Sequence, residues 1–325
     1  MPSEATVYQN GNNEKMIGSV LRELNVRRED VTIATKVGLF GPPISKGKDR
    51  KEVFLNRFNE SLDRLKMAYV DILYFHAANG PDQVNDPFIM EAFTELKANK
   101  KIRFSGFSTH IDWPELVTDA SNRKFYDVIL IAFNFSMFED KRVFDALKKA
   151  YDAGIGLVAM KTQCQQDWYK RELPAEQQKY YKETQMNAAL LKWTLKHEYI
   201  TTAIPGFTTY EQLEEDMVVA YDLNYKKEEE DFFKNNNIKL AIKSVCRHCG
   251  KCVASCSKNV DIPSLMRTRM YSLSYGNPLM AKQTLSGIQP GRGLDVCKDC
   301  GICTGRCQYR VPIAKHISDL RDIYC

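Results

Sequence analysis

Several features are missing from this 325-residue sequence, and each absence excludes a class of protein. No apolar run approaches the roughly 20 residues that a helix needs to cross a bilayer, so we expect no membrane partner. Basic residues are mixed with acidic ones and the net charge is only +5, which leaves no nucleic-acid footprint. No G-x-G-x-x-G follows an early strand pattern, and no flavin motif is visible. The sequence opens without a signal-peptide pattern, so we expect a cytoplasmic protein in a reducing compartment.

Cysteine is nearly absent from the first three quarters of the chain, where Cys164 stands alone, but nine of the ten cysteines follow from Cys246 onward. The spacing C-x2-C-x2-C-x3-C occurs twice there. Three thiolates in a tight loop can hold three corners of an iron–sulfur cubane, and a fourth, one helical turn later, suits a neighbouring cubane. The spacing therefore predicts two [4Fe–4S] clusters. Cluster one would be bound by Cys246, Cys249, Cys252 and Cys307, and cluster two by Cys297, Cys300, Cys303 and Cys256.

Zinc and disulfides are the alternatives for these cysteines. Zinc sites use thiolates in widely separated pairs and do not need a third Cys three residues on. Disulfides rarely gather so many cysteines in loops this short, and a reducing compartment disfavours them. The ferredoxin pattern has a Pro after the fourth Cys, whereas Ser257 and Gln308 stand at those positions here. Since Pro shapes the turn but is not a ligand, the cluster prediction stands.

Helical and strand patterns alternate from residue 14 to about residue 204. Repeated strand–helix units with largely apolar strands indicate a parallel sheet covered by helices. Their number favours a (β/α)8 TIM-type barrel, with a doubly wound sheet as the second possibility. The predicted strands are residues 31–36, 70–76, 102–108, 127–133, 156–161 and 200–204.

The C-terminal part of the chain has a different character. Residues 262–271 and 313–324 show helical periodicity, which indicates a mostly helical, two-cluster ferredoxin-like domain. The charged stretch 225–237 is expected to be a linker or a last helix before that domain. We therefore divide the chain into a barrel over residues 1–235 and a 4Fe–4S domain over residues 236–325.

Polar residues stand at the ends of the predicted strands. In barrels of this type the chemistry is located there, because the loops that follow the strands surround one mouth. The polar stretch 164–181 would be a loop that covers the mouth, or simply a solvated linker. The strand-end residues are Lys36, His76, Ser108, Asn134 and Lys161.

Residues 8–18 resemble the Y-x-x-G-x-x-E-x-x-x-G stretch of the aldo/keto reductase family, with Tyr8, Gly11, Glu14 and Gly18 at its fixed positions. The whole chain resembles the subgroup of this family that has a C-terminal 4Fe–4S ferredoxin-type domain. Later landmarks of the family follow in the right order at residues 34–36 (ATK), 69–76 (YVDILYFH), 106–108 (GFS) and 204–206 (IPG).

This resemblance implies an NADPH-linked reduction of a small carbonyl substrate. Tyr8 would be the general acid, Lys36 the cation that lowers its pKa, and His76 the residue that orients the carbonyl. Taken singly, each has a plainer interpretation: a surface aromatic, a solvated charge and a core histidine. The Asp of the family's catalytic tetrad corresponds to Ser3, so this member is missing.

The resemblance also implies how NADPH is held. The family's Asn at the adenine corresponds to Asp216 and its Gln under the nicotinamide to Leu130, two departures from the pattern. A helix start after the turn at residues 205–206 would favour phosphate, and Lys161 would contact substrate or phosphate. The predicted cofactor-binding residues are Ser108, Asn134, Lys161, Pro205, Gly206, Thr208, Thr209 and Gln212.

Compared with the family, the sequence starts where the second strand ends. We therefore expect a barrel that lacks its first strand–helix unit and most of strand two. The clusters would be an electron relay, with a redox partner protein, or a structural element. The alternative function is an iron–sulfur electron-transfer or docking protein with a catalytically impaired barrel, and a weaker one is a reading frame with no independent function.

Overall fold

The computed structural model describes residues 11–39, 48–110, 113–164, 174–184, 186–207, 209–243, 245–297 and 303–325. Three residues with a predicted role, Tyr8, Thr208 and Cys300, lie outside these ranges. The chain divides into two compact units. Unit 1 contains the residues up to Ala132 with Lys141–Met160 and Glu198–Ile204, and unit 2 contains Phe133–Asp140, Lys161–His197 and Pro205–Cys325.

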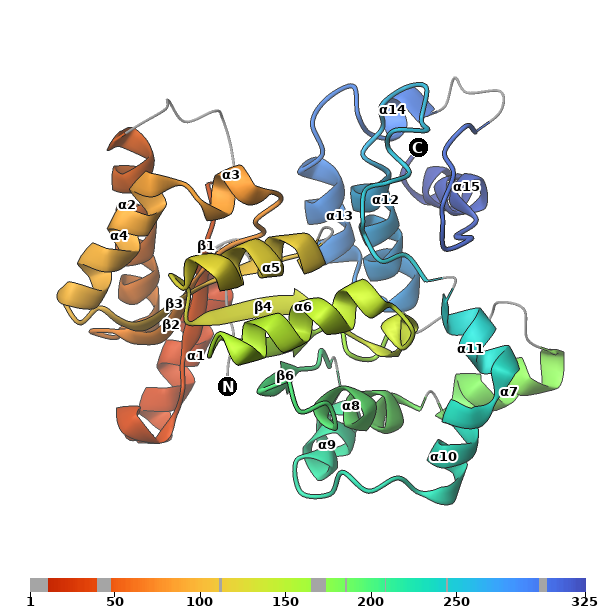
Figure 1. Ribbon diagram of the computed structural model, residues 1–325, viewed down its shortest axis with the longest axis horizontal. Coiled ribbons are helices and arrows are strands. Elements are labelled where there is room, and N and C mark those ends of the chain that lie inside the picture. Colours follow the sequence, from red (N-terminus) through yellow and green to blue (C-terminus); the bar gives the residue numbers. More distant parts are fainter. Residues whose placement is uncertain are drawn as a thin grey trace. The chain divides into compact units, whose positions relative to one another are not determined.

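Unit 1 is built on a curled sheet of six parallel strands in sequence order (Figure 1). All six strands lie within one or a few residues of their predicted positions, which confirms the strand–helix alternation inferred from the sequence. The strands are β1 Ala34–Val37, β2 Val70–Phe75, β3 Ile102–Thr109, β4 Val128–Ala132, β5 Gly156–Met160 and β6 Thr202–Ile204.

The strand register places residues from different strands on one face of the sheet. Lys36 of β1 lies opposite Tyr74 of β2, and Ser108 of β3 lies opposite Leu130 of β4. Successive side chains of a strand alternate between faces, so every second residue belongs to this layer. The buried residues of this layer form an apolar cluster: Ala34, Ile72, Tyr74, Leu130, Val158 and Met160.

The helices of unit 1 bury one face each. In α6 the buried residues Val143, Ala146, Leu147 and Ala150 recur at helical spacing, as an amphipathic helix requires. The start of α4 is fixed by Asp86, whose carboxylate accepts the Phe88 backbone N–H at 2.9 Å. These helices are α1 Asn12–Glu23, α2 Lys48–Leu65, α3 Pro81–Val84, α4 Pro87–Ala98, α5 Trp113–Arg123 and α6 Lys141–Asp152.

The start of α1 explains why the stretch that begins at Tyr8 has its glycines and its Glu. Gly11 adopts φ +81°, which favours glycine. At Gly18, a Cβ would lie 2.2 Å from the Leu65 carbonyl oxygen, so only glycine permits this approach of α1 to α2. Glu14 is fully buried between the two helices, where Arg64 Nε donates to it at 2.7 Å.

Unit 2 is helical and contains two apolar clusters. One surrounds Phe135, Leu190 and Phe232, and the other surrounds Leu265, with six cysteines packed against it. None of the helices in the described part of the chain is both long and apolar enough to cross a membrane. The helices are α7 Ala175–Thr184, α8 Asn187–Leu195, α9 Tyr210–Val219, α10 Lys227–Lys234, α11 Asn236–Lys243, α12 Ile262–Arg269, α13 Pro278–Ser286, α14 Leu294–Cys297 and α15 Ile313–Tyr324, with a π-helix at Met270–Ser274.

One expectation is wrong in part. The polar stretch 164–181 was expected to be a loop, but α7 begins at Ala175 within it. The segment AEQQKYYKET consists largely of residues with high helix propensity, which outweighs its lack of a clear apolar stripe. The predicted division of the chain at residue 235 stays a prediction.

Candidate functional site

Three of the predicted site residues lie in unit 1, at the carboxyl ends of neighbouring strands. Lys36 is in β1, His76 directly follows β2, and Ser108 is near the end of β3. His76 is two residues beyond Tyr74, which pairs with Lys36, so the strand alternation continues the same face. The sequence thus places an amine and an imidazole in one layer at one edge of the sheet.

Lys36 is only 3% exposed, although a lysine is rarely buried to this extent. Taking an ammonium out of water costs free energy unless other groups stabilise it. His76 and Ser108 are buried as well. Burial of three polar side chains at one strand edge is typical of a barrel active site.

The loop after β2 is fixed from both neighbouring strands. The His76 backbone N–H donates to the Val37 carbonyl oxygen at 2.9 Å. The Ala77 backbone N–H donates to Ser108 Oγ at 3.0 Å. Ser108 therefore helps to position His76, in addition to its predicted contact with the cofactor.

Tyr74 is a polar residue of this layer that the sequence analysis did not single out. Its side chain is fully buried, and no group in the described ranges forms a hydrogen bond with its hydroxyl. Burial raises the pKa of Tyr74 well above that of an ordinary tyrosine. The period-2 alternation with His76 was the signal in the sequence that could have revealed it.

The remaining predicted residues of the barrel lie in unit 2. Asn134 Nδ2 donates to the Lys161 carbonyl oxygen at 2.9 Å, and Asn134 Oδ1 accepts the Ser136 backbone N–H at 3.1 Å. The Cys164 thiol donates to the same oxygen at 3.4 Å. Asn134 therefore connects its own turn to the segment from Lys161 to Cys164. The Nζ of Lys161 donates to Tyr271 Oη at 2.8 Å.

Helix α9 begins where a phosphate-binding helix start was expected. Thr209 is its N-cap, and its hydroxyl accepts the Gln212 backbone N–H at 3.3 Å. Gly206, three residues before the cap, is exposed, and Pro205 is partly exposed. These residues leave a helix N-terminus at the surface, as an anion site of this kind needs.

The two departures from the family pattern have clear structural settings. Leu130 is fully buried in the apolar layer of the sheet. Asp216 is buried and accepts Gln163 Nε2 at 2.7 Å. Burial and the nearby charge of Glu215 raise the pKa of Asp216 to about 7, although the hydrogen bond from Gln163 opposes this shift.

In the iron–sulfur region, the thiols of Cys246, Cys249, Cys252 and Cys307 lie close enough to influence one another. Burial raises the pKa of Cys246 to about 12; the hydrogen bond from the His248 backbone N–H opposes this shift, and the proximity of the other three thiols adds to it. Two of these sulfur atoms accept backbone N–H groups at 3.4 Å, Cys246 from His248 and Cys307 from Tyr309. Such N–H···S bonds are a normal feature of cluster-binding thiolates.

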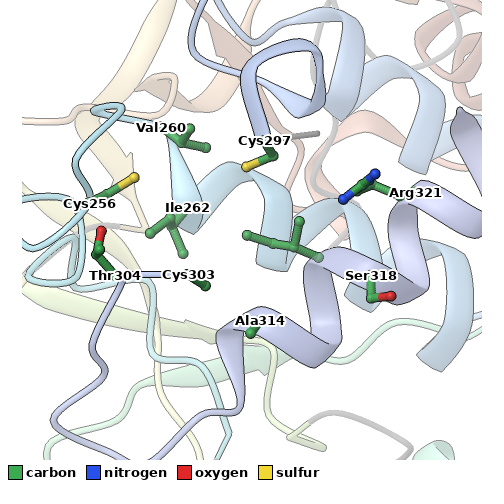
Figure 2. A pocket seen from close by; sticks show the side chains of 10 residues that line it. Cys256, Val260, Ile262, Cys297, Cys303, Thr304, Ala314, Ser318 and Arg321 are labelled. Carbon is green, nitrogen blue, oxygen red and sulfur yellow. The ribbon is translucent and has the colours of Figure 1, made fainter. Parts of the chain in front are cut away.

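A second group of thiols lines one cavity of about 180 Å³ (Figure 2). Cys256 comes from the first cysteine run, whereas Cys297 and Cys303 come from the second. The sulfur atoms of Cys256 and Cys297 are presented to this cavity, and Arg321 of α15 lies on its wall. Cys300, the fourth predicted ligand, is outside the described residues.

The two thiol groups fit iron–sulfur clusters by their donor chemistry and by the way they share ligands between the two runs. His248, within the first cysteine run, has a left-handed backbone conformation with φ 54°. Among the described side chains, no three His, Cys, Asp or Glu residues form a site for a single metal ion.

Comparison with known protein families gives two matches. The model of the aldo/keto reductase family matches residues 4–234, and the model of the 4Fe-4S dicluster domain matches residues 245–312.

Two relatives from Arabidopsis thaliana illustrate the range of similarity. A probable voltage-gated potassium channel subunit beta is 41% identical over 83 residues, which are 25% of this chain and 25% of that protein. L-galactose dehydrogenase is 27% identical over 230 residues, which are 65% of this chain and 70% of that protein. The chain thus spans a quarter of the length of the first relative and 70% of the length of the second.

Solved structures show the same architecture. An aldo-keto reductase of Bacillus halodurans in its holo form has a TM-score of 0.54 at 22% identity, covering 73% of this chain and 84% of that one. An aldo/keto reductase of Klebsiella pneumoniae in complex with NADP and acetate has a TM-score of 0.53 at 18% identity, covering 73% of this chain and 79% of that one. At these identities the likeness concerns the fold, and it confirms the predicted (β/α)8 type.

Proposed function

The chain belongs to the aldo/keto reductase family and carries a 4Fe-4S dicluster domain, and we propose a specific reaction for it. We propose that it uses NADPH to reduce the carbonyl group of a small aldehyde or ketone. The products would be an alcohol and NADP+.

The observation that carries this proposal is the lysine buried at the carboxyl end of β1. Lys36 is 3% exposed and lies in the same layer of the sheet as His76. A buried ammonium is costly unless neighbouring groups stabilise it, and we propose that this one acts in the reaction. Its proposed target is the phenol of Tyr8, whose ordinary pKa near 10 makes it too weak an acid at neutral pH.

Each residue has a defined part in the proposed reaction. When bound, NADPH supplies a hydride to the carbonyl carbon. Tyr8 gives its proton to the carbonyl oxygen, and Lys36 makes this transfer easier because its charge favours the phenolate that remains. His76 donates a hydrogen bond that orients the carbonyl. Ser3 replaces the family's Asp, so Lys36 would act without that carboxylate.

The residues proposed to hold NADPH lie mainly around the start of α9. Thr209 caps this helix, and helix N-termini favour phosphate groups. Pro205, Gly206, Thr208 and Gln212 would complete this contact. Asn134, Lys161 and Ser108 are proposed to line the nicotinamide end, because they lie at strand ends.

We further propose two [4Fe–4S] clusters, each sharing one cysteine with the opposite run. Their role as an electron relay requires a one-electron step, because a hydride carries two electrons. A structural role is supported by the packing of the cysteines against the apolar cluster around Leu265.

The proposal is tested with the anaerobically purified, full-length protein. Iron and sulfide analysis should give close to eight of each per chain for two cubanes. Lys36→Met should lower kcat with a small aldehyde about 100-fold or more, a scale typical of losing general acid–base assistance, while NADPH binding stays nearly unchanged. Lys148→Met removes an exposed lysine and is the matched control. Equal activity of Lys36→Met and wild type would contradict the proposal.

A second function is favoured by the departures at Leu130 and Asp216. With a weakened grip on NADPH, the chain would be an electron-transfer protein whose barrel docks a redox partner. Stopped-flow mixing with NADPH separates the two. Bleaching of the cluster absorbance without a mediator supports a relay fed by NADPH. No NADPH binding at all, with intact clusters, supports the docking protein.

A further inference from the structure

The cavity lined by the second group of thiols has a wall that is made by helix α15 (Figure 2). Four residues of this helix lie on that wall at helical spacing: Ala314, Ile317, Ser318 and Arg321. Residues three, four and seven positions apart share one face of a helix, so the wall is a single face of α15. Among the described residues that line the cavity, Arg321 is the one with a permanently charged side chain.

Arg321 forms no ion pair with a carboxylate in the part of the chain that the structure describes. The acidic residue two positions before it is used elsewhere. Asp319 accepts Nε of Arg269 in α12 at 3.0 Å, and Lys315 lies 3.4 Å from its other oxygen. Two positions along an α-helix differ by about 200° in direction, because a turn has 3.6 residues. Asp319 therefore faces α12, and Arg321 is left on the side of the cavity.

A cation without a carboxylate partner on a cavity wall indicates what kind of occupant the cavity suits. Taking a charge partly out of water costs free energy unless an opposite charge stabilises it. The same cavity is lined by Cys256, Cys297 and Cys303, three of the proposed ligands of cluster two. An iron–sulfur cluster bound by thiolates is an anion, and its reduction potential depends on the charges around it. Arg321 and the cluster therefore complement each other in charge.

We propose that Arg321 raises the reduction potential of cluster two by stabilising its reduced form. This inference rests on the two clusters proposed above and deepens their role in electron transfer. Reduction transfers one electron from a one-electron donor to the cluster, which gains one negative charge, and no bond in the protein forms or breaks. The positive charge of Arg321 stabilises the more negative, reduced cluster more than the oxidised one. Removing this charge therefore lowers the potential.

The size of the effect follows from the surroundings of the guanidinium. Arg321 is half-buried, and Ser318 on the same face of α15 is exposed, so water reaches this side of the cavity. The effective dielectric constant therefore lies between that of a protein interior and that of water. In such surroundings, a unit charge changes a nearby charging equilibrium by about tenfold. Tenfold in the equilibrium constant of a one-electron reduction corresponds to about 59 mV.

The test is an anaerobic redox titration of the full-length, cluster-loaded protein with dithionite, followed by electron paramagnetic resonance. Arg321→Leu should lower one of the two midpoint potentials by about 59 mV and leave the other unchanged. Arg321→Lys keeps the charge and should restore most of the wild-type potential. Lys315→Met is the matched control, because it removes an exposed charge from the same helix but from outside the face that lines the cavity, and it should shift neither potential.

A double variant assigns the shift to one cluster. Cys256→Ser should leave only cluster one, because Cys256 is a proposed ligand of cluster two. Adding Arg321→Leu to Cys256→Ser should then leave the potential of the remaining cluster unchanged. If the potential of that cluster falls as it does in the single variant, Arg321 acts on cluster one and the assignment to cluster two is wrong.

The outcomes separate this inference from the proposed clusters. Wild-type protein without iron and sulfide would contradict the clusters, and the inference with them. Full iron content with equal potentials in wild type and Arg321→Leu would overturn the role of Arg321 alone. Arg321→Gln is a second uncharged variant, which keeps the potential measurable if Arg321→Leu loses a cluster. If both variants lose about half of the iron, Arg321 holds the cluster in place, and its role in setting the potential is overturned.

Discussion

Glu14 offers the sharpest test of how the family's N-terminal stretch holds the barrel together. The carboxylate is fully buried, with Arg64 Nε at 2.7 Å and the Thr35 hydroxyl at 2.6 Å. Thr35 is the neighbour of Lys36, so Glu14 connects α1 and α2 to the strand that carries the proposed catalytic lysine. We expect Glu14→Ala to destabilise the protein strongly.

The size of the effect follows from the burial. Removing one partner of a buried ion pair typically costs 3–5 kcal/mol, because the other charge stays buried without compensation. Arg64 is 17% exposed and has a second carboxylate, Glu60, at 3.6 Å, which softens the loss. We therefore expect about 3 kcal/mol, the lower end of that range. This corresponds to a change of roughly 100-fold in the unfolding equilibrium.

The assay is urea unfolding of the anaerobically purified protein, followed by far-UV circular dichroism. Asp152→Ala is the control, because Lys148 and Asp152 form a similarly short pair, 2.6 Å, in which both side chains are exposed. An exposed pair of this kind contributes about 0.5 kcal/mol or less. A double-mutant cycle of Glu14→Ala with Arg64→Met isolates the pair. If Glu14→Ala costs no more than the exposed control, burial does not set the strength of this contact.

Three further predictions concern the clusters and two carboxylates. Cys256 lies in the first cysteine run, but Cys256→Ser should remove cluster two and about half of the iron. Cys325 is exposed, and Cys325→Ser should remove no iron. Iron analysis and electron paramagnetic resonance would measure both effects. Burial would raise the pKa of Asp71, but hydrogen bonds from the Ile33 backbone N–H and from two arginines outweigh burial and lower the pKa. The ionised Asp71 therefore stabilises the fold fully above about pH 4, and this stabilisation is lost as pH falls through the folded-state pKa. Asp71→Asn should therefore lower stability more at pH 7 than at pH 2, as urea unfolding at both values would show. The pKa of Asp216 is about 7, above the unfolded value, so the protein is less stable once this carboxyl ionises. Asp216→Asn should raise stability at pH 8 by roughly 1 to 2 kcal/mol, and the gain should vanish near pH 4.

The fold was largely predictable because its signals are local. Strands such as β2, β4 and β5 are short apolar runs, and the helices between the strands show apolar residues at helical spacing, as in α6. The prediction was weakest where apolar periodicity is weak. Helix α7, with its polar sequence, was expected to be a loop for this reason.

The candidate site could be predicted only in part. Strand ends revealed Lys36, His76 and Ser108 because parallel strands bring their carboxyl ends to one edge. Tyr74 was missed, because period-2 alternation places it in the layer of His76 but does not reveal that no described group bonds to its hydroxyl. The assignment of roles to Tyr8 and to the NADPH-binding residues stays a prediction.

The sequence by itself determined the strand–helix alternation and the two cysteine runs, because both depend on spacing within a few residues. Only the tertiary structure decided which distant groups meet. Glu14 meets Arg64 across 50 residues, and Lys161 reaches Tyr271 across 110 residues. Such contacts depend on how helices and strands pack, and no local pattern of residues encodes them.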